Sequence, residues 1–175
     1  MAQLTNIKSN DPNIGISGNI VMTLMKDYLD KGRILYTDNW YTSPALYSLL
    51  HAHKTNACGT VKKKSGKNMP KFTEKLQRGE MTFQSSKECL CIKWYYKREI
   101  HMLTTNHSYG MTATGKQDRK IKQDILKPDS VLDYNKNMGA VDRSDMLLSS
   151  IESVRKIKKW YRKLCFHLLD LCVLN

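Results

Sequence analysis

The sequence lacks several features that would assign it to a familiar class. No run of about 18 apolar residues occurs, and the opening segment MAQLTNIKSNDPNIG has no apolar core of the kind found in secretory signals. The cysteines number 5, an odd count, and they form no C-x-x-C pair, so we expect neither a disulfide framework nor a zinc site. These absences predict an intracellular, soluble chain with reduced and mostly buried thiols.

Acidic residues are also scarce. The chain has 16 Asp and Glu against 29 Lys and Arg, for a formal net charge of +13 over 175 residues. A chain of this length forms one domain, or one domain with a small insertion, and can bury a core. Its charge indicates a polyanionic partner, nucleic acid first and an anionic membrane surface second. The alternative is a basic protein without a specific partner.

The first part of the sequence predicts a helix, a strand, a second helix and a second strand in succession. The expected elements are a helix from Ile20 to Leu29 that ends at Gly32, a strand over 33–37, a helix from Ser43 and a strand over 57–62. Ser43 is a natural N-cap, and Pro44 suits the first helical position. A single short helix between two strands favours parallel pairing in an α/β sheet.

The remainder divides into a basic β-rich region and a helical end. An exposed basic loop over 62–78 precedes short strands expected at 81–84, 90–96 and 100–105, then a linker over 106–127 and helices from Ser130. Short turns permit only antiparallel pairing, so we expect these strands to lie outside the parallel sheet. The predicted divisions are 13–62 as the first part of the core, 63–130 as an insertion-like region and 131–175 as the C-terminal helical part.

Four short motifs occur in a fixed order along the chain. They are DNWYTS from Asp38, GTV from Gly59, DYN from Asp133 and GAVD from Gly139. Their order and spacing resemble the catalytic domain of piggyBac-type transposases and their domesticated derivatives, over nearly the whole chain from about Asn13. Each motif alone is weak evidence for this resemblance, whereas the four motifs in this order are specific evidence for it.

This resemblance implies a ribonuclease-H-like fold in which three aspartates hold two divalent metal ions for DNA strand cleavage and joining. On the matching positions, Asp38 is the second aspartate, Asp142 is the third, and Asp145 is a further acidic position that could bind metal. The implied cofactor is Mg²⁺ or Mn²⁺, and hard carboxylate oxygens suit such ions. We therefore expect the carboxylates of Asp38 and Asp142 to converge at one end of the sheet.

Each of these carboxylates also has a structural alternative. Asp38 could be a carboxylate near the N-terminus of the helix that follows it, which stabilises a helix by only a few tenths to about 1 kcal/mol. Asp142 and Asp145 could be solvated charges on one side of a helix.

The chain departs from the family pattern at its front. The first aspartate of the family lies on a strand upstream of the position of Asn13, and Asp11, which precedes Pro12 in a polar turn, is not accepted as its substitute. The expected fold is thus an α/β, ribonuclease-H-like core that is incomplete at the N-terminus and carries a small inserted β element. We expect a DNA-binding, transposase-derived domain without cleavage activity. The alternatives are an active DNA transposase when upstream sequence completes it, or a non-functional transposon remnant.

Candidate DNA contacts come from two basic tracts. They are Lys62, Lys63, Lys64, Lys67, Arg155, Lys156, Lys158, Lys159, Arg162 and Lys163. Aromatic residues interleave the second tract, which suits phosphate contact with stacking and also resembles a nuclear localisation signal, so we expect a nuclear protein. The alternative is a solvated helix face whose Ile157, Trp160 and Tyr161 pack inward. DNA is the expected partner, a homodimer is left open, and neither a membrane nor a small-molecule substrate is expected. The histidines are assigned no chemistry.

Overall fold

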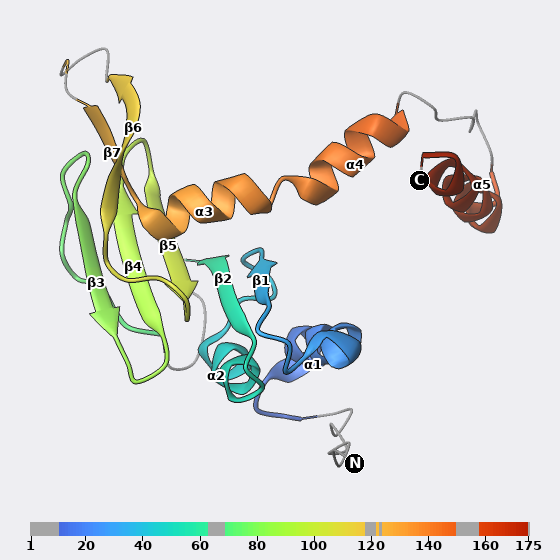
Figure 1. Ribbon diagram of the computed structural model, residues 1–175, viewed down its shortest axis with the longest axis horizontal. Coiled ribbons are helices and arrows are strands. Elements are labelled where there is room, and N and C mark those ends of the chain that lie inside the picture. Colours follow the sequence, from blue (N-terminus) through green and yellow to red (C-terminus); the bar gives the residue numbers. More distant parts are fainter. Residues whose placement is uncertain (1–10, 63–68, 118–121, 123, 150–157, 175) are drawn as a thin grey trace. The chain divides into compact units, whose positions relative to one another are not determined.

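The computed structural model describes residues 11–62, 69–117, 122, 124–149 and 158–174 (Figure 1). The chain divides into two compact units, Met1–Asn135 and Lys136–Asn175. The three-part division at 62/63 and 130/131 stays a prediction. All five cysteines are free, and Cys58, Cys89 and Cys91 are buried.

The first unit opens with the helix–strand–helix–strand order that the sequence predicts. Its elements are α1 (Gly15–Met25), the 3₁₀ turn η1 (Lys26–Tyr28), β1 (Ile34–Thr37), α2 (Pro44–Ala52) and β2 (Asn56–Val61). β1 and β2 pair in parallel from Ile34↔Asn56 to Thr37↔Gly59, which confirms the expected pairing. The Ser43 hydroxyl accepts from the Leu46 amide at 3.3 Å, so Ser43 is the N-cap of α2.

The prediction that Gly32 ends the first helix was wrong. α1 ends at Met25, the chain tightens into η1, and Leu29 is already extended, with φ −66° and ψ 161°. Gly32 has φ +65° and lies in the connection to β1. Gly32 therefore adopts a left-handed conformation within a loop and does not end a helix.

Three further strands continue the same sheet. They are β3 (Met81–Ser85), β4 (Leu90–Tyr95) and β5 (Glu99–Thr104), and the strand order is β1-β2-β5-β4-β3. β3–β4 and β4–β5 pair antiparallel as the short turns predict. The expectation that these strands lie outside the sheet was wrong, because β5 also pairs antiparallel with β2, for example at Gly59↔Leu103.

The segment expected to be a linker instead contains a β-hairpin. β6 (Met111–Gln117) and β7 (Asp124–Pro128) pair antiparallel in a second, two-stranded sheet with a register irregularity between Ala113 and Gln117. Most residues of this hairpin are exposed, so its sequence shows little of the apolar alternation that identifies a strand. Met111 nevertheless packs against a buried cluster of the main sheet.

The five-stranded sheet has a buried cluster on each face. One contains residues of α1 and α2, including Val21, Leu46 and Tyr47. The other contains Ile92 and Met102 together with residues of α3 (Asp129–Asn137). Successive strand residues face opposite sides, and accordingly Leu35 packs on the first cluster and Tyr36 on the second.

The second unit contains α4 (Ala140–Ser149) and α5 (Trp160–Leu174), which contact each other. Leu148 of α4 and Asp170 of α5 are buried. Within the described residues, no helix combines the length and the apolar character that crossing a membrane requires.

Candidate functional site

Asp38 directly follows the last residue of β1 and begins the turn toward α2. Its backbone carbonyl accepts from the Tyr41 amide at 3.3 Å, the Thr42 amide at 3.2 Å and the Thr42 hydroxyl at 2.8 Å. Its Oδ1 accepts from the Trp40 amide at 2.9 Å, and among the described residues no hydrogen bond engages Oδ2. The carboxylate thus closes an Asx-type turn, whereas Ser43 is the N-cap of α2.

Beneath this turn lies a set of buried hydroxyls, which we name the hydroxyl cluster: Thr37, Thr42 and Tyr47. Thr37 Oγ1 lies 2.8 Å from Thr42 Oγ1 and 2.7 Å from Tyr47 Oη. Thr37 and Thr42 are 5% exposed and Tyr47 is 0% exposed. Desolvation raises the pKa of Tyr47, so its phenol stays protonated and can donate.

Gly59 of β2 is the neighbour that leaves room for these hydroxyls. A Cβ at this position would lie 2.4 Å from both Thr42 Oγ1 and Tyr47 Oη and 2.5 Å from Thr37 Oγ1. No ordinary side chain fits at such distances. The glycine of the GTV motif is therefore required by close approach of three oxygen atoms.

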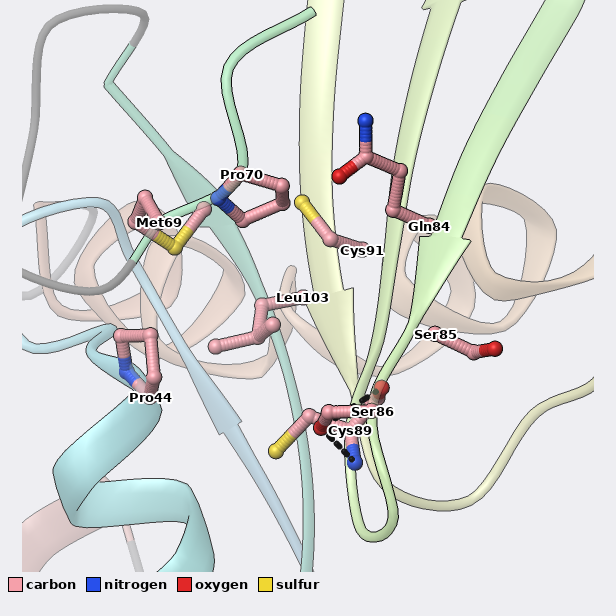
Figure 2. A pocket seen from close by; sticks show the side chains of 9 residues that line it. All are labelled: Pro44, Met69, Pro70, Gln84, Ser85, Ser86, Cys89, Cys91 and Leu103. Carbon is pink, nitrogen blue, oxygen red and sulfur yellow. Dashed lines mark hydrogen bonds between the residues drawn. The ribbon is translucent and has the colours of Figure 1, made fainter.

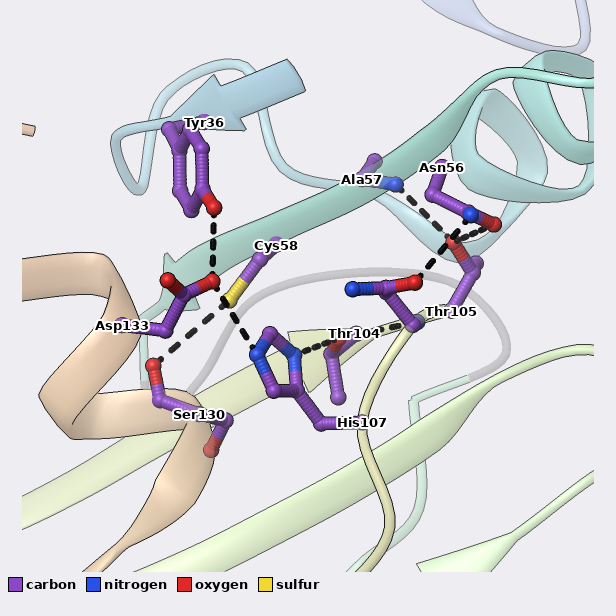
Figure 3. Close-up of polar contacts among 10 residues, drawn as sticks. Tyr36, Asn56, Ala57, Cys58, Thr104, Thr105, His107, Ser130 and Asp133 are labelled. Atoms are coloured by element: carbon purple, nitrogen blue, oxygen red, sulfur yellow. Dashed lines mark hydrogen bonds and ion pairs between the residues drawn. The ribbon is translucent and has the colours of Figure 1, made fainter. Parts of the chain in front are cut away.

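A second polar group lies on the other face of β1, and we name it the carboxylate cluster: Tyr36, His107 and Asp133 (Figure 3). Tyr36 Oη donates to Asp133 Oδ2 at 2.6 Å, and His107 Nε2 donates to the same oxygen at 3.1 Å. His107 Nδ1 lies 2.8 Å from Thr104 Oγ1. Burial, followed by the hydrogen bond and charge of Asp133, raises the pKa of Tyr36. This cluster joins β1, the segment after β5 and α3.

The carboxylate cluster was not predicted from the sequence. Asp133 was recognised only as part of a motif, and no chemistry was expected of His107, whose partners are 26 residues away at Asp133 and 3 residues away at Thr104. No local spacing signals such contacts. Nearby, the buried Cys58 thiol donates to the Ser130 carbonyl at 3.7 Å, and burial raises the pKa of Cys58 to about 12.

The other predicted metal ligands lie in the second unit. Asp142 is exposed in the first turn of α4, and Asp145 belongs to the same helix, although its side chain falls outside the described set. Because Asp38 belongs to the first unit, its convergence with Asp142 stays a prediction. Within the residues that the structure describes, no group of three or more His, Cys, Asp or Glu could hold a metal ion. Asp38, with one hard carboxylate oxygen unengaged by described residues, fits as one ligand of Mg²⁺.

The predicted DNA contacts are described in part. Lys62 follows β2 and is exposed, as are Lys158 and Lys159 before α5 and Arg162 and Lys163 in α5. The others, Lys63, Lys64, Lys67, Arg155 and Lys156, lie outside the described residues. Of the three residues that the alternative expects to pack inward, Trp160 is 74% exposed and Tyr161 is 50% exposed, whereas Ile157 lies outside the described residues.

A pocket of about 350 Å³ lies between the start of α2 and strands β3 to β5 (Figure 2). Its lining is mainly apolar, with Met69, Pro70 and Leu103 among the contributing residues. Burial raises the pKa of Cys91 to about 12, so this thiol stays protonated and unreactive. None of the predicted site residues lines this pocket, and its lining offers no group suited to phosphoryl transfer.

A family described as Transposase IS4 matches residues 3–175. The chain is similar to human PiggyBac transposable element-derived protein 2, with 20% identity over 177 residues that cover 94% of this chain and 30% of that protein. It is also similar to human PiggyBac transposable element-derived protein 3, with 26% identity over 143 residues that cover 75% and 24%, respectively.

Among solved structures, the chain is similar to a piggyBac transposase determined by cryo-EM in a synaptic complex with hairpin DNA. The TM-score is 0.76 at 20% identity, and the match covers 97% of this chain and 35% of that one. This likeness shows the fold, a mixed α/β arrangement. The chain spans about a third or less of the length of these relatives.

Proposed function

This chain belongs to the piggyBac-type transposase family, and from that premise we propose that its 175 residues form a DNA-binding domain related to metal-dependent DNA cleavage and joining. The proposed core is ribonuclease-H-like. The observation that carries the proposal is the position of Asp38. This residue stands at the C-terminal end of a strand paired in parallel, and one of its carboxylate oxygens is unengaged by the described residues. Ligand groups in α/β sheets gather at that end of the strands.

The metal ions of this chemistry would be Mg²⁺ or Mn²⁺, and Asp38 and Asp142 would hold them, with Asp145 beside Asp142 on α4. When bound, a pair of such ions stabilises the attacking and leaving oxygens of an in-line displacement. These 175 residues supply two of the three aspartates that the family resemblance implies. We therefore propose that this polypeptide by itself binds DNA without cutting it, and that a longer chain with the third carboxylate cuts.

DNA binding rests on distributed positive charge. The net charge is +13, and the exposed residues Lys158, Lys159, Arg162 and Lys163 stand close together in sequence around the start of α5. The similar solved transposase is held with hairpin DNA, which supports DNA as the partner proposed here. Each phosphate that a cation neutralises releases counterions, so binding of this kind weakens steeply as salt rises.

The test of DNA binding is the salt dependence of the affinity for a labelled duplex. Replacing Lys158, Lys159, Arg162 and Lys163 by Ala should flatten the log–log salt slope by about 0.9 for each phosphate that the variant no longer neutralises. The matched control replaces four exposed lysines elsewhere, namely Lys26, Lys31, Lys87 and Lys136, and removes the same charge. Equal flattening by both variants would show that the α5 tract has no special role, and salt-independent binding would refute the proposed mode.

The test of cleavage uses the same duplex with Mg²⁺ or Mn²⁺. We expect no cutting by the 175-residue polypeptide, and the variants Asp38→Ala and Asp142→Ala should behave like it. Cutting that either substitution abolishes would overturn the proposed inactivity and favour a complete site within these residues.

We further propose that the protein is nuclear, because the tract from Arg155 to Lys163 resembles a nuclear localisation signal. A fluorescent fusion of the chain should accumulate in nuclei. The four-residue Ala variant of the α5 tract should lose that accumulation, whereas the matched lysine control should keep it.

A further inference from the structure

The hydrogen bonds of the hydroxyl cluster can be arranged with donors and acceptors in only one order. A backbone carbonyl can only accept, so Thr42 Oγ1 donates to Asp38 O at 2.8 Å. Having used its single proton, the Thr42 hydroxyl accepts from Thr37 Oγ1, and by the same rule Thr37 accepts from Tyr47 Oη. The bonds therefore run in one sense, from Tyr47 through Thr37 and Thr42 to Asp38.

This chain of donors has little room to rearrange. Its three side chains are at most 5% exposed, so a hydroxyl that loses its partner is not readily rescued by water. The backbone of Gly59 borders the three hydroxyls closely, since even one methyl group at that position would lie within 2.5 Å of all three oxygens. Burial of this kind strengthens linked hydrogen bonds and raises the cost of breaking them.

We propose that Thr42, Thr37 and Tyr47 are positioning residues that fix the carboxylate of Asp38 for metal binding. The inference rests on the proposed function, because it assigns these residues to the same site. Thr42 Oγ1 and the amides of Tyr41 and Thr42 hold the Asp38 carbonyl, and the carbonyl and the Oδ1–Trp40 bond belong to one turn. Holding the turn therefore keeps one carboxylate oxygen on the Trp40 amide and leaves the other for a cation.

The reporter of this geometry is the Trp40 amide, which donates to Asp38 Oδ1. Its exchange rate with solvent, measured by NMR on the metal-free chain, is compared with that of the Ile92 amide in β4, which pairs with a strand on each side. Thr42→Val keeps the shape of the side chain but removes the hydroxyl, and it should speed Trp40 exchange about fivefold relative to Ile92. Thr42→Ser restores a hydroxyl and should return the ratio to within about twofold of the parent.

A variant at the far end of the hydroxyl cluster keeps the inference testable if Thr42→Val fails to fold. Tyr47→Phe preserves the buried ring and removes the first donor, and it should speed Trp40 exchange about twofold relative to Ile92. Faster exchange at Trp40 with rescue by Ser supports the positioning role. Equal change at Trp40 and Ile92, or no change in either variant, overturns it, because the hydroxyls then contribute only to global stability.

A second measurement separates this inference from the proposed function. Added Mn²⁺ should broaden the Trp40 amide resonance of the parent and leave that of Asp38→Asn sharp. If the parent shows no broadening, the metal role of Asp38 in the proposed function fails. The exchange experiment uses neither metal nor DNA, so it decides independently whether the hydroxyls hold the Asp38 turn.

Discussion

The two polar clusters on opposite faces of β1 are built in different ways. In the hydroxyl cluster, Thr37 bonds to partners 5 and 10 residues away, and all three members are buried and uncharged. In the carboxylate cluster, Tyr36 bonds to Asp133 across 97 residues, and the acceptor is a partly exposed carboxylate. One cluster is completed within a single β-α-β unit, whereas the other ties α3 to that unit.

The difference shows how one short strand can serve two purposes. Successive residues of β1 point to opposite faces, so Thr37 contributes to the turn that carries Asp38 while Tyr36 anchors a helix from far along the chain. A neutral buried network is sensitive to shape, because each hydroxyl has fixed neighbours. A carboxylate that accepts two hydrogen bonds is sensitive to loss of its charge or of its position.

The largest effect on stability that would test this difference between the clusters is expected from a substitution at Gly59. Gly59→Ala places a methyl group within 2.5 Å of all three hydroxyl oxygens and should destabilise the first unit by about 3 kcal/mol. Urea denaturation measures the loss. The control is Gly139→Ala, where the added Cβ has no neighbour within 4 Å and should change stability by no more than about 0.5 kcal/mol. A loss at Gly59 as small as that of the control would mean that the cluster tolerates repacking.

The next largest effect is expected in the carboxylate cluster. Asp133→Ala removes the acceptor of both Tyr36 and His107 and should cost about 2 kcal/mol, since two donors then lose their charged partner. The same urea denaturation measures it, with Asp124→Ala, an exposed residue of β7, as the control. If Asp133→Ala matched this control, the hydrogen bonds of Asp133 would contribute little to holding α3.

Features within one β-α-β unit were predictable from the sequence, and features that join distant segments were not. Ser43 and Pro44 predicted the start of α2, and the short β-prone run before Asp38 predicted β1 with a carboxylate at its end. The pairing of β5 with β2 places Leu103 opposite Gly59, and the sequence of neither strand identifies the strand with which it pairs. The β6–β7 hairpin was missed because its exposed Thr, Lys and Gln residues give no apolar periodicity.

The candidate site follows the same rule. Asp38 could be proposed from the sequence because its motif is local, and its role as a metal ligand stays a prediction. The hydroxyl cluster includes Thr42 of that motif. His107 was missed because its function depends on Asp133 meeting Tyr36, which only tertiary structure brings about. Whether Asp142 joins Asp38 stays a prediction.

A smaller effect separates the two clusters at alkaline pH. The pKa values of Tyr47 and Tyr36 are raised in the folded state, mainly by burial, so their stabilising contribution is full below the unfolded value near 10 and is lost as pH rises above it. At pH 10.5 the buried Tyr47 should account for a loss of about 1 kcal/mol, and Tyr36 for less because solvent screens it. Stability measured from pH 8 to 10.5 should therefore fall less steeply in Tyr47→Phe than in Tyr36→Phe. The reverse order would contradict the assignment of Tyr47 to the more deeply buried cluster.

The smallest expected effect concerns the order in which the clusters form during folding. Local contacts close short loops and tend to form before long-range ones, so the hydroxyl cluster should be largely formed in the folding transition state and the carboxylate cluster should form after it. We take the loss of each phenol hydroxyl to lower the free energy of unfolding by about 1 kcal/mol. Tyr47→Phe should then slow folding about threefold, and Tyr36→Phe should mainly speed unfolding, about fivefold. Stopped-flow folding and unfolding rates across urea concentrations measure both, with Tyr109→Phe, an exposed ring whose stacking on Phe83 is kept, as the control. Slower folding in Tyr36→Phe than in Tyr47→Phe would mean that α3 docks before the turn at Asp38 is complete, and the local cluster would then depend on the distant one.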